Sequence, residues 1–143
     1  MALEIATEIP VPIGLRPKLR RVLTALCKAN QISSDICIIL TDDDRLRALK
    51  LEFWQEDATT DVLTFPQWEP SDLFMPPVLG DIYINLEMAA QQAAERNHSL
   101  TTEVILLAAH GLTHLIGFDH QTPEAWQRFY TMERLALTHL SQA

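Results

Sequence analysis

Residues 104–116 read VILLAAHGLTHLI, a stretch that is apolar on every side of a helix. Such a helix belongs in the interior of a domain rather than on its surface. Apart from Thr113, its only polar side chains are His110 and His114. Because these two are four residues apart, both rings leave the same face of the helix, with Cβ atoms about 5–6 Å apart. We predict a buried helix that presents two imidazoles at one point of its surface.

A third histidine follows this helix closely. Gly117 suits a helix C-cap, and the turn that it allows can bring His120 back toward His110 and His114. Neutral imidazoles are good zinc ligands, and three protein ligands leave the fourth tetrahedral position open, as in catalytic sites. The spacing therefore predicts one Zn²⁺ per chain.

The remaining sequence supplies the elements around that helix. The chain has 143 residues, of which 48% are hydrophobic, enough for one domain with a real core. Apolar periodicity predicts strands at 3–9, 34–40, 61–65 and 80–86, and helices at 17–29, 42–53, 87–97, 100–116 and 123–140. The order β-α-β-α-β-β-α-α-α predicts a single α/β domain over residues 1–143, with a mixed four-stranded sheet covered by about five helices. Thr41 and Thr122 are the expected N-caps of the second and the last helix.

The charge distribution limits the possible partners. The formal net charge is −8, divided into +2 over residues 1–50 and −10 over residues 51–143. A general polyanion binder is usually basic, so we do not expect DNA as a partner. One basic group lies at the start of the first predicted helix, either as a solvated helix face or as a small positive patch. It consists of Arg16, Lys18, Arg20 and Arg21.

The other ionisable and reactive side chains have simpler expectations. Cys27 and Cys37 lie in apolar stretches without disulfide or thiolate-zinc spacing, which predicts buried free thiols. His98 and His139 have no partners in the pattern, and we expect them to be solvated. No apolar run approaches the roughly 20 residues of a bilayer span, so we expect a cytoplasmic protein without membrane partners.

Two families share parts of the histidine pattern. The spacing H-x-x-x-H-x-x-G-x-x-H is similar to that of metzincin proteases, whose general base is a glutamate directly after the first histidine. Gly111 occupies that position here, which leaves a peptidase as a distant alternative. The stretch HGLTHLIGFDH, residues 110–120, resembles the signature of the YbeY family, except that Thr113 replaces an apolar residue. Residues 60–66 (TDVLTFP) and 80–82 (GDI) also resemble YbeY strand motifs, so the resemblance covers essentially the whole chain.

The YbeY resemblance implies a metal-dependent endoribonuclease of ribosomal RNA maturation, with His110, His114 and His120 as zinc ligands. It implies ribosomal RNA, the ribosome or assembly proteins as partners, and small-subunit RNA that is single-stranded or loosely structured as substrate. Asp119 either holds a ligating imidazole in its tautomer or caps the turn as an exposed acid. Asp61 and Asp81 are further acids of the strand motifs, or simply cap a strand or turn.

One departure from the family pattern concerns the second predicted helix. The family commonly carries asparagine and, four residues on, arginine, where this chain has Lys50 and Trp54. Trp54 is either a buried core residue or a ring on which a base stacks, and Lys50 can supply a point charge.

Several interpretations remain open at this stage. No side chain is assigned as general base, and attack by water and by the ribose 2′-OH are both possible. A non-catalytic ribosome-assembly factor with a structural zinc and a zinc hydrolase of another substrate are the alternatives. The proline-rich segment 66–79 is a lid, an RNA contact or a docking site for a partner.

Overall fold

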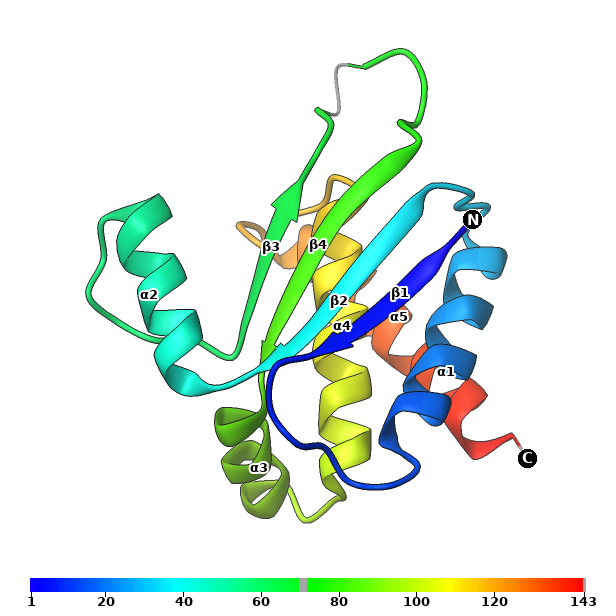
Figure 1. Cartoon of the computed structure of the whole chain (residues 1–143). Coiled ribbons are helices and arrows are strands. Elements are labelled where there is room, and N and C mark those ends of the chain that lie inside the picture. Colours follow the sequence, from blue (N-terminus) through cyan, green and yellow to red (C-terminus); the bar gives the residue numbers. More distant parts are fainter. Residues whose placement is uncertain (70–71, 143) are drawn as a thin grey trace.

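The structure, a computed structural model, describes residues 1–69 and 72–142. Strands and helices alternate through α2, and two consecutive strands and then three consecutive helices follow (Figure 1). In chain order they are β1 (Leu3–Thr7), α1 (Leu15–Ala29), β2 (Asp35–Thr41), α2 (Asp43–Trp54), β3 (Val62–Pro66), β4 (Val78–Asn85), α3 (Leu86–Glu95), α4 (Leu100–Leu115) and α5 (Pro123–Ser141).

The four strands form one mixed sheet in the order β1-β2-β4-β3. Strands β1, β2 and β4 are parallel, with Ile38 opposite both Ile5 and Ile82. Strand β3 runs antiparallel to β4, with Leu63 opposite Tyr83. The predicted α/β class, sheet and five helices are therefore confirmed, and β3 is an edge strand.

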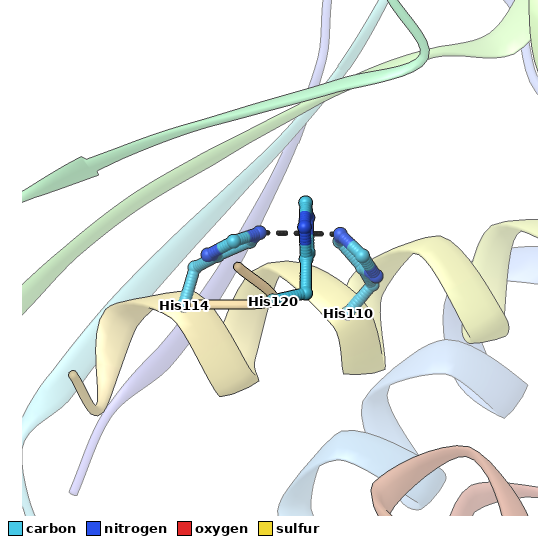
Figure 2. A group of neighbouring side chains, drawn as sticks. All are labelled: His110, His114 and His120. Atoms are coloured by element: carbon cyan, nitrogen blue, oxygen red, sulfur yellow. Dashed lines mark hydrogen bonds between the residues drawn. The ribbon is translucent and has the colours of Figure 1, made fainter. Parts of the chain in front are cut away.

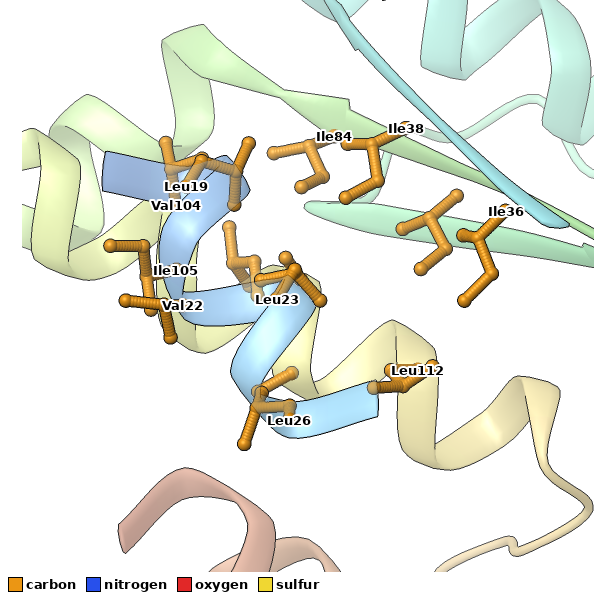
Figure 3. Packing of buried hydrophobic residues seen from close by; sticks show 14 of the residues in the cluster. Leu19, Val22, Leu23, Leu26, Ile36, Ile38, Ile84, Val104, Ile105 and Leu112 are labelled. Carbon is orange, nitrogen blue, oxygen red and sulfur yellow. The ribbon is translucent and has the colours of Figure 1, made fainter. Parts of the chain in front are cut away.

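The main core lies between the sheet and helices α1 and α4, with α5 behind them (Figures 1 and 3). Ile36, Ile38 and Ile84 point from the strands toward these helices (Figure 3). Helix α4 contacts β3 and β4 on one side and α1, α3 and α5 on its other sides. This position explains why residues 104–109 are apolar in every direction.

Helix α2 covers part of the opposite sheet face. Its Leu46 and Leu49 are buried against Leu63, beside Phe65 and Tyr83. Because successive strand residues point to opposite faces, β3 turns its alternate side chains toward α4. The edge strand is therefore flanked by α2 on one face and by α4 on the other.

The structure corrects one predicted cap. Strand β2 continues through Thr41, which pairs with Asn85, so Thr41 is not the N-cap of α2. Asp42 takes that role, and its side chain accepts a hydrogen bond from the Arg45 backbone N–H at 2.9 Å. Thr122 caps α5 as expected.

The structure also tests the expectations for the cysteines, the basic residues of α1 and membrane-spanning helices. Cys27 is buried, but Cys37 is only half-buried because it points to the sheet face that α1 and α4 do not cover. Arg16 and Arg20 donate to the Ile5 and Leu3 carbonyls at 2.8 and 2.5 Å, so these guanidinium groups fasten α1 to β1. No helix among the described residues combines the length and the apolarity needed to cross a bilayer.

The proline-rich segment 66–79 connects β3 to β4, and its residues 70 and 71 lie outside the described residues. Its Trp68 indole N–H donates to the Leu115 carbonyl at 2.6 Å, which satisfies a carbonyl group at the C-terminal end of α4. Leu73 and Phe74 are largely exposed.

Candidate metal centre

Helix α4 and the turn after it position three histidines. His110 and His114 are one turn apart near its C-terminal end. Gly117 adopts a φ of 105°, and its N–H donates to the His114 carbonyl at 3.0 Å. The Phe118 N–H donates to the Thr113 carbonyl at 3.3 Å, which completes a Schellman motif. This turn reverses the chain and places His120 opposite the two helical rings.

We call His110, His114 and His120 the histidine cluster, and Figure 2 shows its three rings facing a common point. The Nε2 atoms of His110 and His114 are 3.2 Å apart, and one nitrogen of each ring lies within 4.8 Å of those of the other two. Two nitrogens on one tetrahedral zinc ion lie about 3.3–3.4 Å apart. The pair on α4 is already at that spacing, so the cluster could hold a metal ion.

The close approach of α4 to the sheet depends on Gly111. A Cβ added there would lie 2.7 Å from the Ile82 Cγ2 atom and 3.3 Å from that of Thr64. The face of α4 that carries Gly111 therefore packs directly against the sheet. The position that carries the metzincin glutamate has no room for one in this fold.

A backbone contact and burial both favour rings that can bind a cation. The Phe118 carbonyl lies 3.1 Å from Nδ1 of His114, which favours the tautomer whose Nε2 lone pair faces the cluster. Burial, followed by repulsion from His114 and His120, lowers the pKa of His110 to about 4, although the Asp61 charge opposes this shift. Burial and His120 also lower the pKa of His114. Both imidazoles are therefore neutral at pH 7, the form that can bind a metal ion.

Helix α5 supports the histidine cluster with aromatic rings that sequence reasoning missed. The buried ring of Phe129 has its centroid 4.7, 4.8 and 5.2 Å from those of His110, His114 and His120. Trp126 stacks on His120 at 4.4 Å with an interplanar angle of 14°. Trp126 and Phe129, three residues apart in a helix whose start at Thr122-Pro123 is clear, could have indicated this support. The same spacing is equally typical of core packing.

The histidine cluster opens into a cavity of about 330 Å³, which we call the histidine cleft. Its other walls are the end of α2 (Lys50 and Trp54), residues 60 and 61, and β3 residues 62–64. Trp54 is 43% exposed, so its interpretation as a buried core residue is wrong. The Lys50 ammonium lies 3.1 Å from the Glu56 carboxylate, which offsets its charge.

The candidate acids occupy three different places. Asp61 lines the histidine cleft, where its carboxylate accepts a hydrogen bond from Gln92 at 3.2 Å. Asp81 lies on the other sheet face, in a cavity of about 290 Å³ beside α2. Asp119 is exposed and accepts from the Gln121 backbone N–H at 3.2 Å, the turn-capping arrangement.

A buried asparagine fixes the chain next to Asp61. The Asn85 side chain donates to Asp43 Oδ1 at 2.8 Å and to the Thr60 carbonyl at 3.1 Å, and it accepts from the Met88 N–H at 3.0 Å. It thus joins α2, the segment before β3 and the N-terminus of α3. The Asn85 side chain is fully buried, and its hydrogen bonds hold one wall of the histidine cleft in place.

His98 is not solvated as expected. Its Nε2 lies 2.6 Å from the fully buried Glu103 carboxylate, which also accepts from Arg96 at 2.9 Å. These contacts compensate the buried charge of Glu103 near the start of α4. His98 therefore has a structural role outside the histidine cleft. His139 is half-buried and contacts Gln142.

A sequence profile described as "Endoribonuclease YbeY" matches residues 6–141. The chain belongs to the YbeY family.

Relatives from several bacteria carry the same family name. The chain is 50% identical over 148 residues to "Endoribonuclease YbeY" of Deinococcus radiodurans, covering 95% of each chain. It is also 50% identical over 135 residues to that of Thermus thermophilus, covering 94% of this chain and 97% of the relative. The solution structure of TM1509 from Thermotoga maritima matches with a TM-score of 0.67 and 24% identity, over 95% of this chain and 89% of that one, and so shares the fold.

The departure of this chain from the YbeY signature at Thr113 has a local explanation. Thr113 is fully buried, and its hydroxyl donates to the Ala109 carbonyl at 2.8 Å. That hydrogen bond satisfies the one polar atom which replaces the apolar residue of the YbeY pattern.

Proposed function

We propose that this chain is a zinc-dependent endoribonuclease that cleaves single-stranded RNA during maturation of small-subunit ribosomal RNA. The observation that carries the proposal is the histidine cluster at the base of the histidine cleft. Its ligand nitrogens lie within 4.8 Å of one another, in a family whose named relatives are endoribonucleases. The cytoplasm as location and the ribosome or its assembly proteins as partners belong to the same proposal.

His110, His114 and His120 would hold the ion. Three neutral nitrogen donors fit Zn²⁺ better than the hard cations Mg²⁺ and Ca²⁺, which favour oxygen ligands. A zinc ion supplies Lewis-acid stabilisation of the negative charge that develops on phosphoryl oxygens. Phe129 and the Phe118 carbonyl orient the imidazoles, and Gly111 sets the depth of the pair on α4 below the cleft.

The shape of the histidine cleft supports single-stranded RNA as substrate. It follows the edge of β3 between α2 and α4, and its volume of about 330 Å³ is that of a small-molecule pocket. Such a cavity can take one or two nucleotides that are turned out of a helix, but not a stacked duplex.

Cleavage of a labelled ribosomal RNA precursor fragment tests the proposal. We expect nuclease-free native protein to cleave it, chelator-treated protein to lose the activity, and added zinc to restore it. His114→Ala should be inactive. His139→Ala removes a histidine at the end of α5 that does not line the cleft, and this variant should be active. Equal behaviour of all these preparations would contradict the ribonuclease assignment.

A ribosome-assembly factor with structural zinc is the second candidate. It is favoured because the cleft has few basic side chains to bind RNA phosphates. Among the described residues that line the histidine cleft, Lys50 is the sole lysine or arginine, and it pairs with Glu56. For this candidate, zinc removal lowers the melting temperature while no preparation cleaves RNA. Melting curves recorded on the same samples as the cleavage assay separate the two candidates.

A further inference from the structure

Trp54 is an aromatic side chain that the fold leaves facing the metal centre. It is 43% exposed, and it lines the histidine cleft together with all three histidines. It is the last residue of α2, directly before Gln55, which adopts a left-handed conformation. A half-exposed indole in a cleft offers a large apolar surface that no part of the described chain covers completely.

The indole is nevertheless held in place. Its ring contacts Phe65 edge-on, with centroids 5.5 Å apart at 62°, and Phe53 at 6.5 Å and 70°. Directly after Trp54 in the chain, the Gln55 and Glu56 backbone N–H groups donate to the Leu51 and Lys50 carbonyls at 3.1 and 3.3 Å. A ring that is fixed from behind and open toward the cleft loses little conformational freedom when a flat ligand stacks on it.

Apart from the metal ion, the side chains near this ring supply little positive charge for phosphate contacts. Lys50 is compensated by Glu56, and residues 51–143 carry a net charge of −10. The arginines at the start of α1 are engaged elsewhere, since Arg16 and Arg20 bind backbone carbonyls of β1. An RNA ligand therefore needs a contact that does not depend on its charge.

The edge of β3 adds polar groups beside the indole. The Asn85 N–H donates to the Asp61 carbonyl, so the alternation of an antiparallel pair turns the backbone groups of Val62 and Thr64 away from β4. In the part of the chain that the structure describes, no strand pairs with that outer edge. Backbone N–H and C=O groups can bind the edge of a flat heterocycle whose face lies on an aromatic ring.

We propose that Trp54 is a base-stacking platform, which binds an unpaired nucleobase of single-stranded RNA next to the phosphodiester at the metal centre. The inference rests on the proposed function for the identity of the ligand. A base within a duplex is already stacked on both faces, so the platform also selects for unpaired RNA. Trp54 is then a positioning and specificity residue that replaces an ionic contact by a stacking contact.

The test is a binding titration with zinc-loaded protein. The probe is a short, fluorescently labelled oligoadenylate with 2′-O-methyl riboses, and a gel after the titration verifies that it is intact. Trp54→Ala should raise Kd by about 5- to 150-fold, the range that loss of one base–aromatic stack produces. Trp54→Phe should restore most of the affinity.

Leu51→Ala is the control. Leu51 is an apolar residue of the same helix, is 51% exposed and lines neither of the two cavities beside α2. We expect it to leave Kd nearly unchanged, and melting curves of both variants verify that they fold. Equal effects of Leu51→Ala and Trp54→Ala, or no effect of Trp54→Ala, would overturn the platform.

Salt dependence provides an independent readout. Trp54→Arg exchanges the stack for a phosphate contact, so the slope of log K against log [salt] should become steeper by about 0.7. Cleavage that persists together with Trp54-independent binding would overturn the platform alone. Trp54-dependent binding without any cleavage would overturn the nuclease while the platform stands.

Discussion

The two cavities beside helix α2 differ in what lies behind their walls. Two of the three histidines in the histidine cleft lie on α4, a buried helix supported by the Phe129 ring of α5. The opposite cavity is lined by Asp81 and Tyr83 of β4 and by Arg45 of α2, which covers this sheet face only in part. Arg45 there already pairs with Glu8 at 3.6 Å and lies over the Tyr83 ring. The side chains of the histidine cleft thus converge because a packed core fixes them. The charged side chains of the opposite cavity are exposed or partly exposed to solvent and do not converge.

The largest expected contrast between the cavities is metal retention. His110→Ala removes one of three nitrogen donors and should weaken zinc binding more than about 100-fold, the upper range for groups that merely orient a ligand. Asp81→Asn changes a polar group of the other cavity and should retain one zinc per chain. Zinc content after dialysis measures both. Full retention by His110→Ala, or loss by Asp81→Asn, would remove the distinction between the cavities.

The support behind the walls should differ in stability as well. Phe129→Ala leaves a hole beneath the histidine cluster and should lower the free energy of unfolding by about 3–5 kcal/mol. Phe53→Ala truncates an exposed ring of the other cavity and should cost about 0.5 kcal/mol. Urea unfolding of the metal-free proteins measures the two values. Similar losses would show that α5 gives the cleft no special support.

The smallest expected effect is a pH-dependent one on the open sheet face. Glu4, Cys37 and Asp81 are neighbours across β1, β2 and β4. Burial, followed by the charge of Glu4, raises the pKa of Asp81. The folded state therefore holds the Asp81 proton more tightly than the unfolded state. The ionised carboxylate weakens the fold at neutral pH, and this penalty disappears as the pH falls through the raised pKa toward about 3.9.

Asp81→Asn should accordingly raise the melting temperature slightly at pH 7, and the gain should shrink as the pH approaches 4. Melting curves of the variant and the parent across this interval provide the measurement. A gain that is constant with pH, or a loss at pH 7, would contradict the assigned direction of the pKa shift.

Sequence predicted the features that depend on residues close to one another in the chain. His110 and His114 were predictable from helical periodicity, and His120 from the glycine that ends the helix. The boundary of β2 was harder, because Thr41 suits both a cap and a strand. Its pairing with Asn85, which is far away in sequence, decided between the two.

The parts that sequence did not predict depend on which elements become neighbours. The exposure of Trp54 follows from the position of β3 at the sheet edge, and no local pattern gives the strand order β1-β2-β4-β3. Phe129 has the pattern of any core residue until α5 is placed beneath α4. Asp61 and Asp81 occur in similar motifs, yet Asp61 lies in the segment before β3 whereas Asp81 lies within β4, and the two residues line different cavities.

Gly111 has a consequence for how this cleft can evolve. A metzincin-like peptidase needs a glutamate at that position, but even the first carbon of any side chain would meet Ile82 at 2.7 Å. Acquiring it requires α4 to move away from the sheet, and such a movement carries both helical histidines with it. The contact between Gly111 and Ile82 therefore couples the gain of that base to a displacement of the His110 and His114 rings.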